Sequence, residues 1–382
     1  MIERMDALML PLNWQRVRLG DIAEIIGGGT PSTQITSFWN GSINWFTPTE
    51  IGITKYVYKS QRTITSLGLK NSSAKLLPIG TILLTSRASI GDCAILKVVA
   101  TTNQGFQSLI PLEKINNEFL YYLILTLKNK LLKLASGSTF LEVSPNKIKN
   151  LLIPLPPLNE QSAIANILSD LDRYLCALDA LILKKESVKK SLSFELLSQR
   201  KRLKGFNQAW QRVRLGDIAN YLTSNLSVEQ ITQQGEIKVY DVNNFIGYTD
   251  TTFISDKPYI SIVKDGSVGR VRILPPKTNI LSTMGALIAN HRTTTEFLFY
   301  LLSNFDFKNF TSGSIIPHIY FKDYKEKTIF LPPLNEQIAI ANILGALDNE
   351  IASLKNKKRQ FENIKKALNH DLMSAKIRVL EK

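Results

Sequence analysis

Cysteine and histidine are scarce in this sequence. The 382 residues include two cysteines, Cys93 and Cys176, and three scattered histidines. Two cysteines so far apart support neither a disulfide framework nor a thiolate metal site. No cluster of carboxylates accompanies the histidines, so nothing indicates a metal-dependent nuclease. We expect no metal and no cofactor in this chain.

Long apolar runs are also missing. No stretch of about 18 or more uncharged apolar residues is present, so we expect no membrane-spanning helix. The first six residues include Glu3, Arg4 and Asp6, and no signal-peptide core follows them. These features predict a cytoplasmic protein without a membrane partner.

Catalytic motifs are absent as well. A DNA amino-methyltransferase holds a flipped base with Pro-Pro-Tyr or Pro-Pro-Phe after Asn or Asp, whereas the Pro-Pro pairs here precede Leu or Lys277. The run Gly27-Gly28-Gly29-Thr30 lacks the Gly-Lys-Ser/Thr of a phosphate loop and is better explained as a flexible turn. We therefore predict a chain without catalysis of its own; a self-contained endonuclease or methyltransferase is a disfavoured alternative.

Positive charge is what the sequence has in excess. Lys and Arg number 47 against 32 Asp and Glu, a formal net charge of +15. Such a balance favours an anionic partner, most often nucleic acid, with an anionic membrane surface as the competitor. The excess is uneven, at +7 in residues 1–156 and +2 in residues 205–332.

An internal repeat organises the chain. Four ordered motifs occur twice: Trp14–Ala23 as Trp210–Ala219, Glu118–Leu123 as Glu296–Leu301, Ser136-Gly-Ser138 as Ser312-Gly-Ser314, and Leu155–Gln161 as Leu331–Gln337. The offset falls from 196 at the first motif to 178 and then 176. The chain is thus a tandem duplication whose copies diverge between Ala23 and Glu118. One scaffold with two different surfaces suits a reader of two different targets.

Each copy is predicted to be an α+β module. Short β-rich runs at 43–46, 80–86 and 94–100 precede an amphipathic helix at 117–134. The second copy repeats this pattern, with strands at 259–263 and 269–274 and a helix at 296–310.

A long helix is predicted after each module. Apolar residues recur at steps of four and three from Ile164 to Ile182 and again from Ile340 to Leu354, which is a heptad seam. Lysines interrupt both seams. The two Pro-Pro pairs are expected to open the helices and Gly205 to cap the first. About 45 residues each would span roughly 65–70 Å, and the duplication predicts an antiparallel coiled coil.

These motifs together resemble the specificity subunit of type I restriction-modification systems. The resemblance covers essentially the whole chain and includes Trp45-Phe-Thr-Pro-Thr-Glu50, for which the second copy shows no counterpart. It implies two target recognition domains, at 1–155 and 206–331, separated by spacer helices at 156–205 and 332–382. Each domain would read half of a bipartite double-stranded DNA site, while the helices fix the spacing.

The resemblance also implies partners. Two methyltransferase subunits would dock on the helices and restriction subunits would join to cut, so the S-adenosylmethionine and ATP chemistry would reside in those partners. The alternative from another class is an oligomeric scaffold whose coiled coil binds proteins and whose modules bind other ligands.

Polar loops beside the strands are the candidates for DNA contact, since arginine suits guanine and asparagine or glutamine suits adenine. Each candidate taken singly is more simply explained as a solvated surface residue than as a DNA contact. In the first module they are Thr47, Thr49, Lys55, Tyr56, Lys59, Gln61, Arg62, Ser86, Arg87, Ser89, Asn103, Gln104, Ser138 and Thr139. In the second they are Tyr240, Asn243, Asn244, Lys264, Ser267, Arg270, Ser314 and His318.

Two further features stay open. The Ser-Gly-Ser runs could offer backbone N–H groups to a phosphate or could be turns that both copies need. Lysines 184, 185, 189 and 190 form a basic stripe on the first long helix, which is explained more simply as a solvated face than as a DNA contact.

Overall fold

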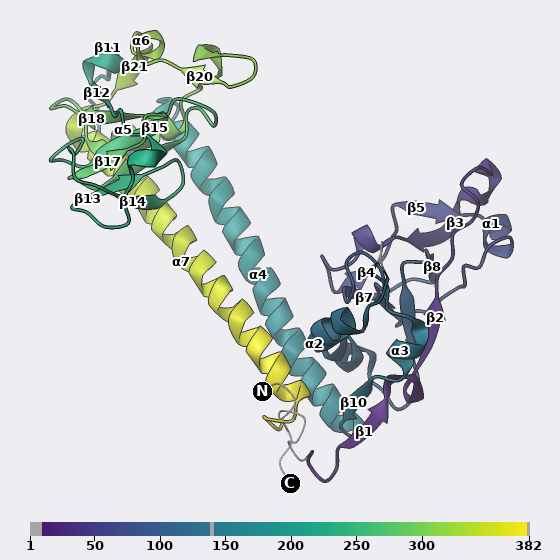
Figure 1. Cartoon of the computed structure of the whole chain (residues 1–382). Coiled ribbons are helices and arrows are strands. Elements are labelled where there is room, and N and C mark those ends of the chain that lie inside the picture. Colours follow the sequence, from purple (N-terminus) through teal and green to yellow (C-terminus); the bar gives the residue numbers. More distant parts are fainter. Residues whose placement is uncertain (1–9, 138–140, 380–382) are drawn as a thin grey trace. The chain divides into compact units, whose positions relative to one another are not determined.

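Two compact units make up the computed structural model, which describes residues 10–137 and 141–379. The first unit joins the residues up to 177 with those from 358 onward, and the second comprises residues 178–357. Each unit holds one α+β module and a segment of each of two long helices, α4 (Leu158–Leu197) and α7 (Leu334–Met373). Figure 1 shows α4 in teal and α7 in yellow. The expected fold class is confirmed.

The first module runs from β1 to β10. Its elements are β1 (Gln15–Arg18), η2 (Leu19–Asp21), β2 (Ala23–Gly27), η3 (Thr36–Phe38), β3 (Trp39–Phe46), η4 (Pro48–Glu50), β4 (Tyr56–Val57), β5 (Arg62–Ile64), α1 (Ser66–Lys70), β6 (Ile82–Leu84), β7 (Cys93–Leu96), β8 (Ala100–Thr102), β9 (Gln107–Pro111), α2 (Asn117–Leu134), α3 (Pro145–Lys149) and β10 (Leu152–Leu155).

The second module runs from β11 to β21. Its elements are β11 (Gln211–Arg214), η5 (Leu215–Asp217), β12 (Ala219–Thr223), η6 (Val228–Gln230), β13 (Ile237–Tyr240), β14 (Phe245–Thr249), β15 (Tyr259–Val263), β16 (Val271–Leu274), β17 (Thr278–Ile280), β18 (Met284–Ala289), α5 (Thr295–Ser303), η7 (Lys308–Phe310), β19 (Thr311–Ser312), β20 (His318–Ile319), α6 (Phe321–Tyr324) and β21 (Thr328–Leu331).

The sheets of the two modules correspond strand by strand. The order β2-β9-β6-β7 in the first module matches β12-β18-β15-β16 in the second, and β5-β3-β8 matches β14-β13-β17. In both three-stranded sheets the last pairing is parallel, β3 with β8 and β13 with β17. The fold thus supplies the counterpart of the Trp45 strand that sequence comparison does not find: Trp45 pairs with Thr101 where Val239 pairs with Asn279.

The divergence between the copies is narrower than the sequence suggests. Strands β7 and β8 begin 178 residues before β16 and β17, the same offset as the helix motif. The length difference of 18 residues therefore arises before β6. The first module's β4 and α1 lie in that stretch and have no counterpart in the second module.

Helix α2 begins and ends at the predicted residues. The side chain of Asn116 caps it by accepting a hydrogen bond from the backbone N–H of Phe119 at 3.0 Å. Its apolar face, which includes Phe119, Leu123 and Leu127, lies in the same core as Ile164 and Leu168 of α4 and Leu372 of α7. The core thus joins the sheet, α2 and the helix pair within the first unit.

Four predicted helix boundaries were wrong: the end of α5, the starts of both long helices and the end of α4. Helix α5 ends at Ser303 rather than Phe310, because Phe305, Phe307 and Phe310 gather instead around Tyr324. Both long helices begin directly after their Pro-Pro pairs. Each pair directly follows a β-strand, β10 in the first module and β21 in the second. Helix α4 ends at Leu197, so Gly205 lies beyond it, with a φ of 90°. Each long helix has 40 residues, or about 60 Å.

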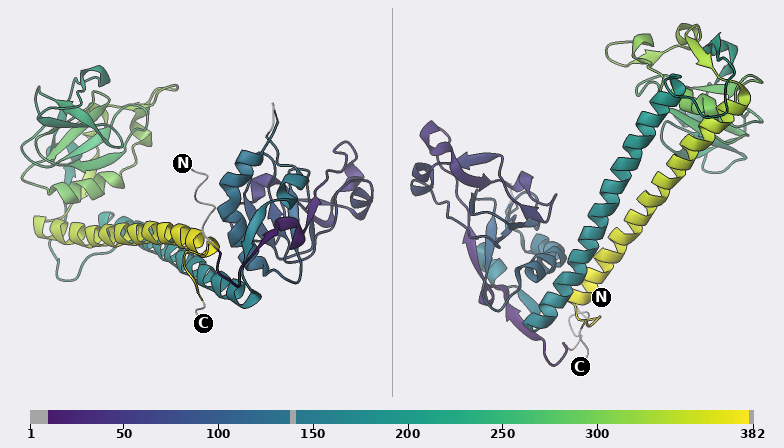
Figure 2. Two further views of the ribbon diagram at one scale, coloured as in Figure 1. Left: turned by 60° about the horizontal axis from the view of Figure 1, so that its bottom comes forward. Right: turned by 180° about the vertical axis from the view of Figure 1, so that it is seen from behind.

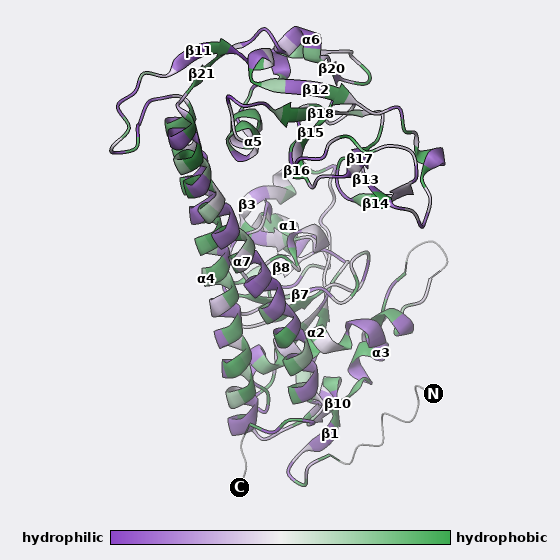
Figure 3. Ribbon diagram, turned by 90° about the vertical axis from the view of Figure 1, so that its left-hand side faces the viewer, coloured by the Kyte–Doolittle hydropathy of each residue, from purple (hydrophilic) through white to green (hydrophobic). Residues whose placement is uncertain are grey.

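The heptad seam is present in both units, with the two helices antiparallel. In the first, the rings of Tyr174 and Phe361 are 4.7 Å apart. In the second, Lys185 pairs with Glu350 at 2.8 Å and Lys189 with Asp348 at 2.5 Å. Lys185 and Lys189, which interrupt the apolar pattern of the first helix, thus pair across the seam. Figure 2 shows the two helices from two further sides, and Figure 3 shows apolar and polar residues alternating along both.

Candidate nucleic-acid interface

The ends of three strands meet at one edge of the first module. The N–H of Asn103, after β8, donates to Phe46 O at the end of β3 at 3.1 Å, and the N–H of Ser86, after β6, donates to Gly105 O at 2.8 Å. A Cβ on Gly105 would stand 2.8 Å from Pro48 Cγ, so the loops after β3 and β8 are in close contact. This strand-end surface brings together five of the predicted residues: Thr47, Thr49, Arg87, Asn103 and Gln104. Ser86 lies beneath it, only 1% exposed, and its hydroxyl donates to Gly105 O at 3.2 Å, so the prediction of a DNA contact there was wrong.

A carboxylate fixes the loop after β3. Glu50 accepts hydrogen bonds from the backbone N–H and the hydroxyl of Thr47, at 2.7 and 2.8 Å, and from the backbone N–H of Gln61 at 2.7 Å. The Thr47 and Thr49 hydroxyls lie 3.0 Å apart. Glu50 thus also ties the segment before β5 to this loop, and the Gln61 side chain there is exposed.

A tight loop, residues 85–92, follows β6 on this edge. Gly91 N–H donates to Thr85 O at 3.0 Å and the Thr85 hydroxyl donates to Ser89 O at 2.6 Å. Ala88 at φ 58° and Gly91 at φ 91° turn the chain. Arg87 Nη2 pairs with Glu142 Oε2 at 2.8 Å. The loop therefore holds Arg87 and Ser89 on a defined backbone, and Glu142 is a neighbour that the sequence does not reveal.

The second module carries an equivalent loop, residues 263–270. Its Gly269 N–H donates to Val263 O at 2.9 Å, and Lys264 N–H donates to Thr283 O at 3.1 Å. Lys264 and Ser267 lie on this loop with Arg270 at its end, and His318 of β20 lies beside it, 4.0 Å from Asp265 between Nδ1 and Oδ1. Ser314 is exposed in the turn between β19 and β20.

The remaining candidates of the second module gather at the end of β13. Asp241 Oδ1 accepts hydrogen bonds from the N–H groups of Asn243 and Asn244 at 2.7 and 2.6 Å. The guanidinium of Arg272 lies 5.0 Å from the Tyr240 ring centroid and donates to Asn243 O at 2.9 Å. Arg272 is a cation at this surface that sequence patterns miss, because it comes from the neighbouring sheet.

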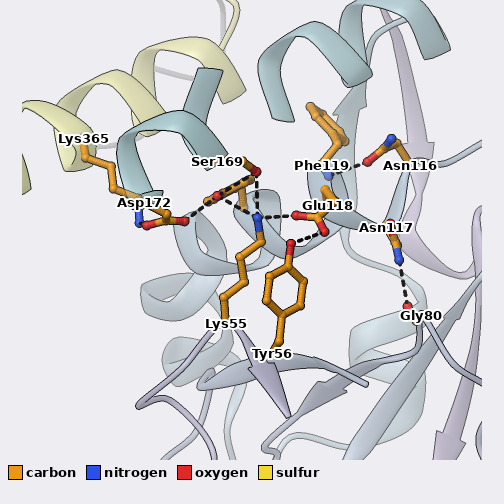
Figure 4. A network of polar contacts seen from close by, with 11 residues as sticks. Lys55, Tyr56, Gly80, Asn116, Asn117, Glu118, Phe119, Ser169, Asp172 and Lys365 are labelled. Carbon is orange, nitrogen blue, oxygen red and sulfur yellow. Dashed lines mark hydrogen bonds and ion pairs between the residues drawn. The ribbon is translucent and has the colours of Figure 1, made fainter. Parts of the chain in front are cut away.

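Lys55, just before β4, and Tyr56 of β4 are engaged elsewhere, in a polar network with α2 and α4 (Figure 4). Lys55 Nζ pairs with Glu118 and donates to the Tyr122 hydroxyl at 2.9 Å and the Ser169 hydroxyl at 2.8 Å, and its side chain is only 11% exposed. Burial lowers the pKa of Lys55, against the opposing effect of Glu118. Burial also raises the pKa of Tyr56, whose hydroxyl donates to Glu118 at 2.5 Å.

The other predicted residues have varied surroundings. The guanidinium of Arg62 lies 3.8 Å from the Trp39 ring centroid and 5.2 Å from that of Trp45, a cation–π arrangement. Lys59 is exposed. Ser138 and Thr139 lie outside the described residues.

Two buried glutamates connect the repeated motifs. Glu160 accepts a hydrogen bond from the Trp14 indole N–H at 3.1 Å, and Glu336 accepts one from Trp210 at 2.9 Å. Arg202 donates to Glu336 from Nε and Nη2, at 3.1 and 2.6 Å. The tryptophan motif and the Leu-Asn-Glu-Gln motif therefore fasten each module to the start of its own helix.

Two kinds of site are not seen in the described residues. Within 10–137 and 141–379, no group of three or more His, Cys, Asp or Glu side chains could hold a metal ion. No helix of those segments is long and apolar enough to cross a membrane. The strand-end surfaces and the helix pair are thus the features that need a functional explanation.

Comparison with known proteins gives the family. The model of the type I restriction modification DNA specificity domain matches residues 11–186 and 207–363. The chain is similar to the type I restriction enzyme MjaIX specificity subunit of Methanocaldococcus jannaschii, with 28% identity over 426 residues that cover 98% of this chain and 96% of the relative.

Two solved structures share the fold. One is a type I restriction-modification S subunit from M. genitalium, with a TM-score of 0.60 and 20% identity, covering 96% of this chain and 98% of that one. The other comes from work on complex assembly and conformational transition of the type I R-M system, with a TM-score of 0.63 and 18% identity, covering 96% and 99%. Since the family model matches most of the chain, once in each half, the chain belongs to the type I restriction-modification DNA specificity family.

Proposed function

We propose that the two modules of this chain each read one half of a bipartite double-stranded DNA site. The observation that carries the proposal is the strand-end surface, which keeps one loop framework in both modules but presents different polar side chains. Loops at strand ends can vary while the sheet beneath them holds their position. Membership of the specificity family favours this function over a scaffold that binds other ligands.

The chain supplies recognition without catalysis. In this proposal methylation and cleavage belong to partner subunits, which hold the S-adenosylmethionine and ATP chemistry. Two methyltransferase subunits dock on the helix pair, one for each copy of the repeat, and restriction subunits complete the complex in the cytoplasm. The duplication supports two docking sites, because repeated surfaces bind repeated partners.

The chain is then divided by role into recognition domains at 1–155 and 206–331 and spacer helices at 156–205 and 332–382. Among the predicted contacts, those on the strand-end surfaces face DNA in our proposal. Lys55 and Tyr56 attach the first module to its helix instead, because their polar atoms already have protein partners.

A segment exchange tests the proposal. Residues 24–117 are replaced by the corresponding segment of a relative with different specificity, and methylated sites are mapped by methylation-sensitive sequencing of host DNA. We expect one half of the recognised sequence to change and the other to stay. The matched exchange of 220–295 should change the opposite half. A change in both halves after a single exchange would show that the two modules do not read DNA independently. If the unmodified complex does not bind DNA at all, the proposed function is wrong.

A further inference from the structure

The 85–92 and 263–270 loops share a backbone hydrogen-bond pattern. Ser86 N–H donates to Gly105 O at 2.8 Å, as Lys264 N–H donates to Thr283 O at 3.1 Å. Ser86 O accepts from the Val143 N–H at 3.1 Å, as Lys264 O accepts from the Ile319 N–H at 2.9 Å. Through these bonds each loop is tied both to the loop that follows β8 or β17 and to the segment before α3 or α6.

The turn within each loop is also the same. Ala88 and Gly266 both have positive φ, 58° and 85°, and so do Gly91 and Gly269, at 91° and 80°. The bridge between Arg87 and Glu142 corresponds to the bridge between Asp265 and His318. The backbone thus places Arg87 where the second module has Asp265, and Glu142 where it has His318.

The side chains at these matched positions are reversed in character. The first module has a donor, Arg87, on the loop and a carboxylate, Glu142, on the adjoining segment, 2.8 Å apart. The second has a carboxylate, Asp265, on the loop and an imidazole, His318, opposite, at 4.0 Å. All four side chains are between 34% and 42% exposed, so each pair is partly open to a ligand.

Arg87 has donor capacity left over. Its Nη2 is paired with Glu142 and its Nε is buried, so the N–H groups at the exposed end of the guanidinium are the donors that a base could meet. A guanidinium carries five N–H donors in a rigid fork, which matches the O6 and N7 acceptors of guanine. A carboxylate accepts hydrogen bonds instead and matches the amino group of cytosine.

We propose that Arg87–Glu142 and Asp265–His318 are equivalent reading pairs, one for each half-site. Arg87 donates to a guanine, with Glu142 as the positioning residue that orients its guanidinium. Asp265 accepts from an exocyclic base amino group, and His318 positions it. The inference rests on the proposed function and deepens it, because it assigns opposite hydrogen-bonding roles to one structural position.

Carboxylates at a DNA-facing surface need such a role. An unpaired carboxylate near phosphates is repelled, and the second module carries a net charge of only +2. The charge of Glu142 is neutralised by Arg87. Asp265 stabilises the DNA complex only if a hydrogen-bond donor of the DNA contacts its carboxylate. A base amino group is a donor that DNA offers in the major groove.

The test uses the full chain in complex with its methyltransferase subunits and a duplex library with both half-sites randomised, selected at one fixed salt concentration. The unmodified complex defines the two half-sites. The variants are Arg87→Ala, Glu142→Gln, Glu142→Asp, Asp265→Asn and the double exchange Arg87→Asp with Glu142→His. Lys70→Ala, an exposed cation of α1, is the control for general loss of charge.

We expect Arg87→Ala and Glu142→Gln to weaken discrimination at the same single guanine of one half-site by about tenfold or more, while Glu142→Asp retains part of it. Asp265→Asn should relax one position of the other half-site only. The double exchange should replace the preference for guanine by one for cytosine or adenine, whose amino groups lie in the major groove. Lys70→Ala should leave every preference unchanged.

The opposite results are equally clear. If the unmodified complex selects two half-sites but Glu142→Gln and Asp265→Asn keep every base preference, the reading pairs are wrong while the proposed function stands. Uniform weakening across all sequences would make Arg87 a phosphate contact and likewise overturn the inference. If the unmodified complex selects no sequence, the proposed function fails, and the inference fails with it. The pairs are partly exposed, so folding should survive their replacement, and circular dichroism checks this for each variant.

Discussion

The guanidinium of Arg378 forms a two-point ion pair with the carboxylate of Glu160, from Nε to Oε1 at 2.7 Å and from Nη2 to Oε2 at 3.1 Å, across 218 residues of sequence. Arg202 makes the same contact with Glu336 in the second unit. In each unit the segment that follows one long helix is thus fastened to the start of the other.

Replacement of Arg378 should therefore loosen one end of the helix pair. Among the described residues, Arg378→Ala leaves the buried Glu160 carboxylate with the Trp14 indole as its remaining donor, and a buried group that loses its partner costs about 1–3 kcal/mol. We expect faster amide hydrogen exchange in residues 14–27 and 158–168. The equivalent segments of the second unit, 210–223 and 334–344, should exchange as before.

Two further variants serve as controls for Arg378→Ala. Lys366→Ala removes an exposed cation of α7, the helix that precedes Arg378, and should change nothing. Arg378→Lys should give an intermediate effect, because an ammonium cannot form the two-point contact. Unchanged exchange in Arg378→Ala would show that the ion pair does not hold this end together.

The stability of the first unit should depend on pH through Lys55. Burial lowers the pKa of Lys55 from its ordinary value of 10.5. Between the lowered pKa and 10.5 the unfolded chain binds a proton that the folded chain has lost, so this group makes stability rise with pH in that window. We expect the free energy of unfolding of the native protein to rise, relative to Lys55→Met, as pH increases toward 10.5.

Urea unfolding at a series of alkaline pH values measures this difference. Tyr56 and Tyr122 act in the opposite sense above pH 10, because burial raises the pKa of each. The comparison with Lys55→Met removes most of their contribution, since both proteins retain these tyrosines. A constant difference between the two proteins across the window would mean that Lys55 does not titrate as its burial requires.

Lys59 should behave unlike Lys55 in DNA binding. Lys59 is exposed, four residues further along the chain, and a lysine that contacts a phosphate contributes about one to the slope of log K against log salt. Lys59→Ala should weaken binding equally for all sequences and reduce that slope by about one. Lys55→Met should leave the slope unaltered, and fluorescence anisotropy at several salt concentrations measures both. Equal slopes for both variants and the native complex would show that Lys59 does not contact a phosphate.

The helix pair should set the spacing of the two half-sites. Shortening only one helix by seven residues mismatches the seam, so both must be shortened. Residues 175–181 and 351–357 are equivalent in the two copies of the repeat, but they do not face each other. The pairs Asp172–Lys365 and Lys185–Glu350 show that 175–181 faces 355–361 across the seam. Deleting these facing segments keeps the pairs on either side intact.

The doubly shortened protein should bring the half-sites closer by at most about three base pairs, since seven residues of helix span roughly 10 Å and DNA rises about 3.4 Å per base pair. The half-site sequences should be retained. Three base pairs also rotate the far half-site by roughly 100°, so affinity should fall as well. Sequencing of selected duplexes measures the spacer. A shortened protein that folds, binds and keeps the original spacer would refute the role of the helices.

The periodic parts of the fold could be predicted from the sequence. Helix α2 and strand β15 have the predicted bounds, because an amphipathic helix and a buried β-branched run leave strong local patterns. The paired long helices followed from the heptad repeat. Their starts and the end of α5 could not be placed, since they depend on where Pro-Pro ends a strand and where three phenylalanines pack around Tyr324.

The strand-end surface was only half predictable. Polar loops such as 85–92 are visible in the sequence, which is enough to predict Arg87 and Ser89 as candidates for DNA contact. Glu142 and Arg272 reach the surface from distant segments, so no local pattern marks them. Lys55 resembles any other loop lysine in sequence, and only the fold reveals its contacts with Ser169 and Glu118.

The paired fastenings at Glu160 and Glu336 have a consequence for the origin of the molecule. One half of the chain, about residues 10–203, contains the acceptor, Trp14 with Glu160, and also the donor, Arg202. In two such halves related by a twofold axis, Arg202 of each half could pair with Glu160 of the other, as Arg378 pairs with Glu160 in the intact chain. The tandem protein is then equivalent to a fused homodimer of self-complementary halves, in which gene duplication freed each half to diverge without loss of the contacts that join them.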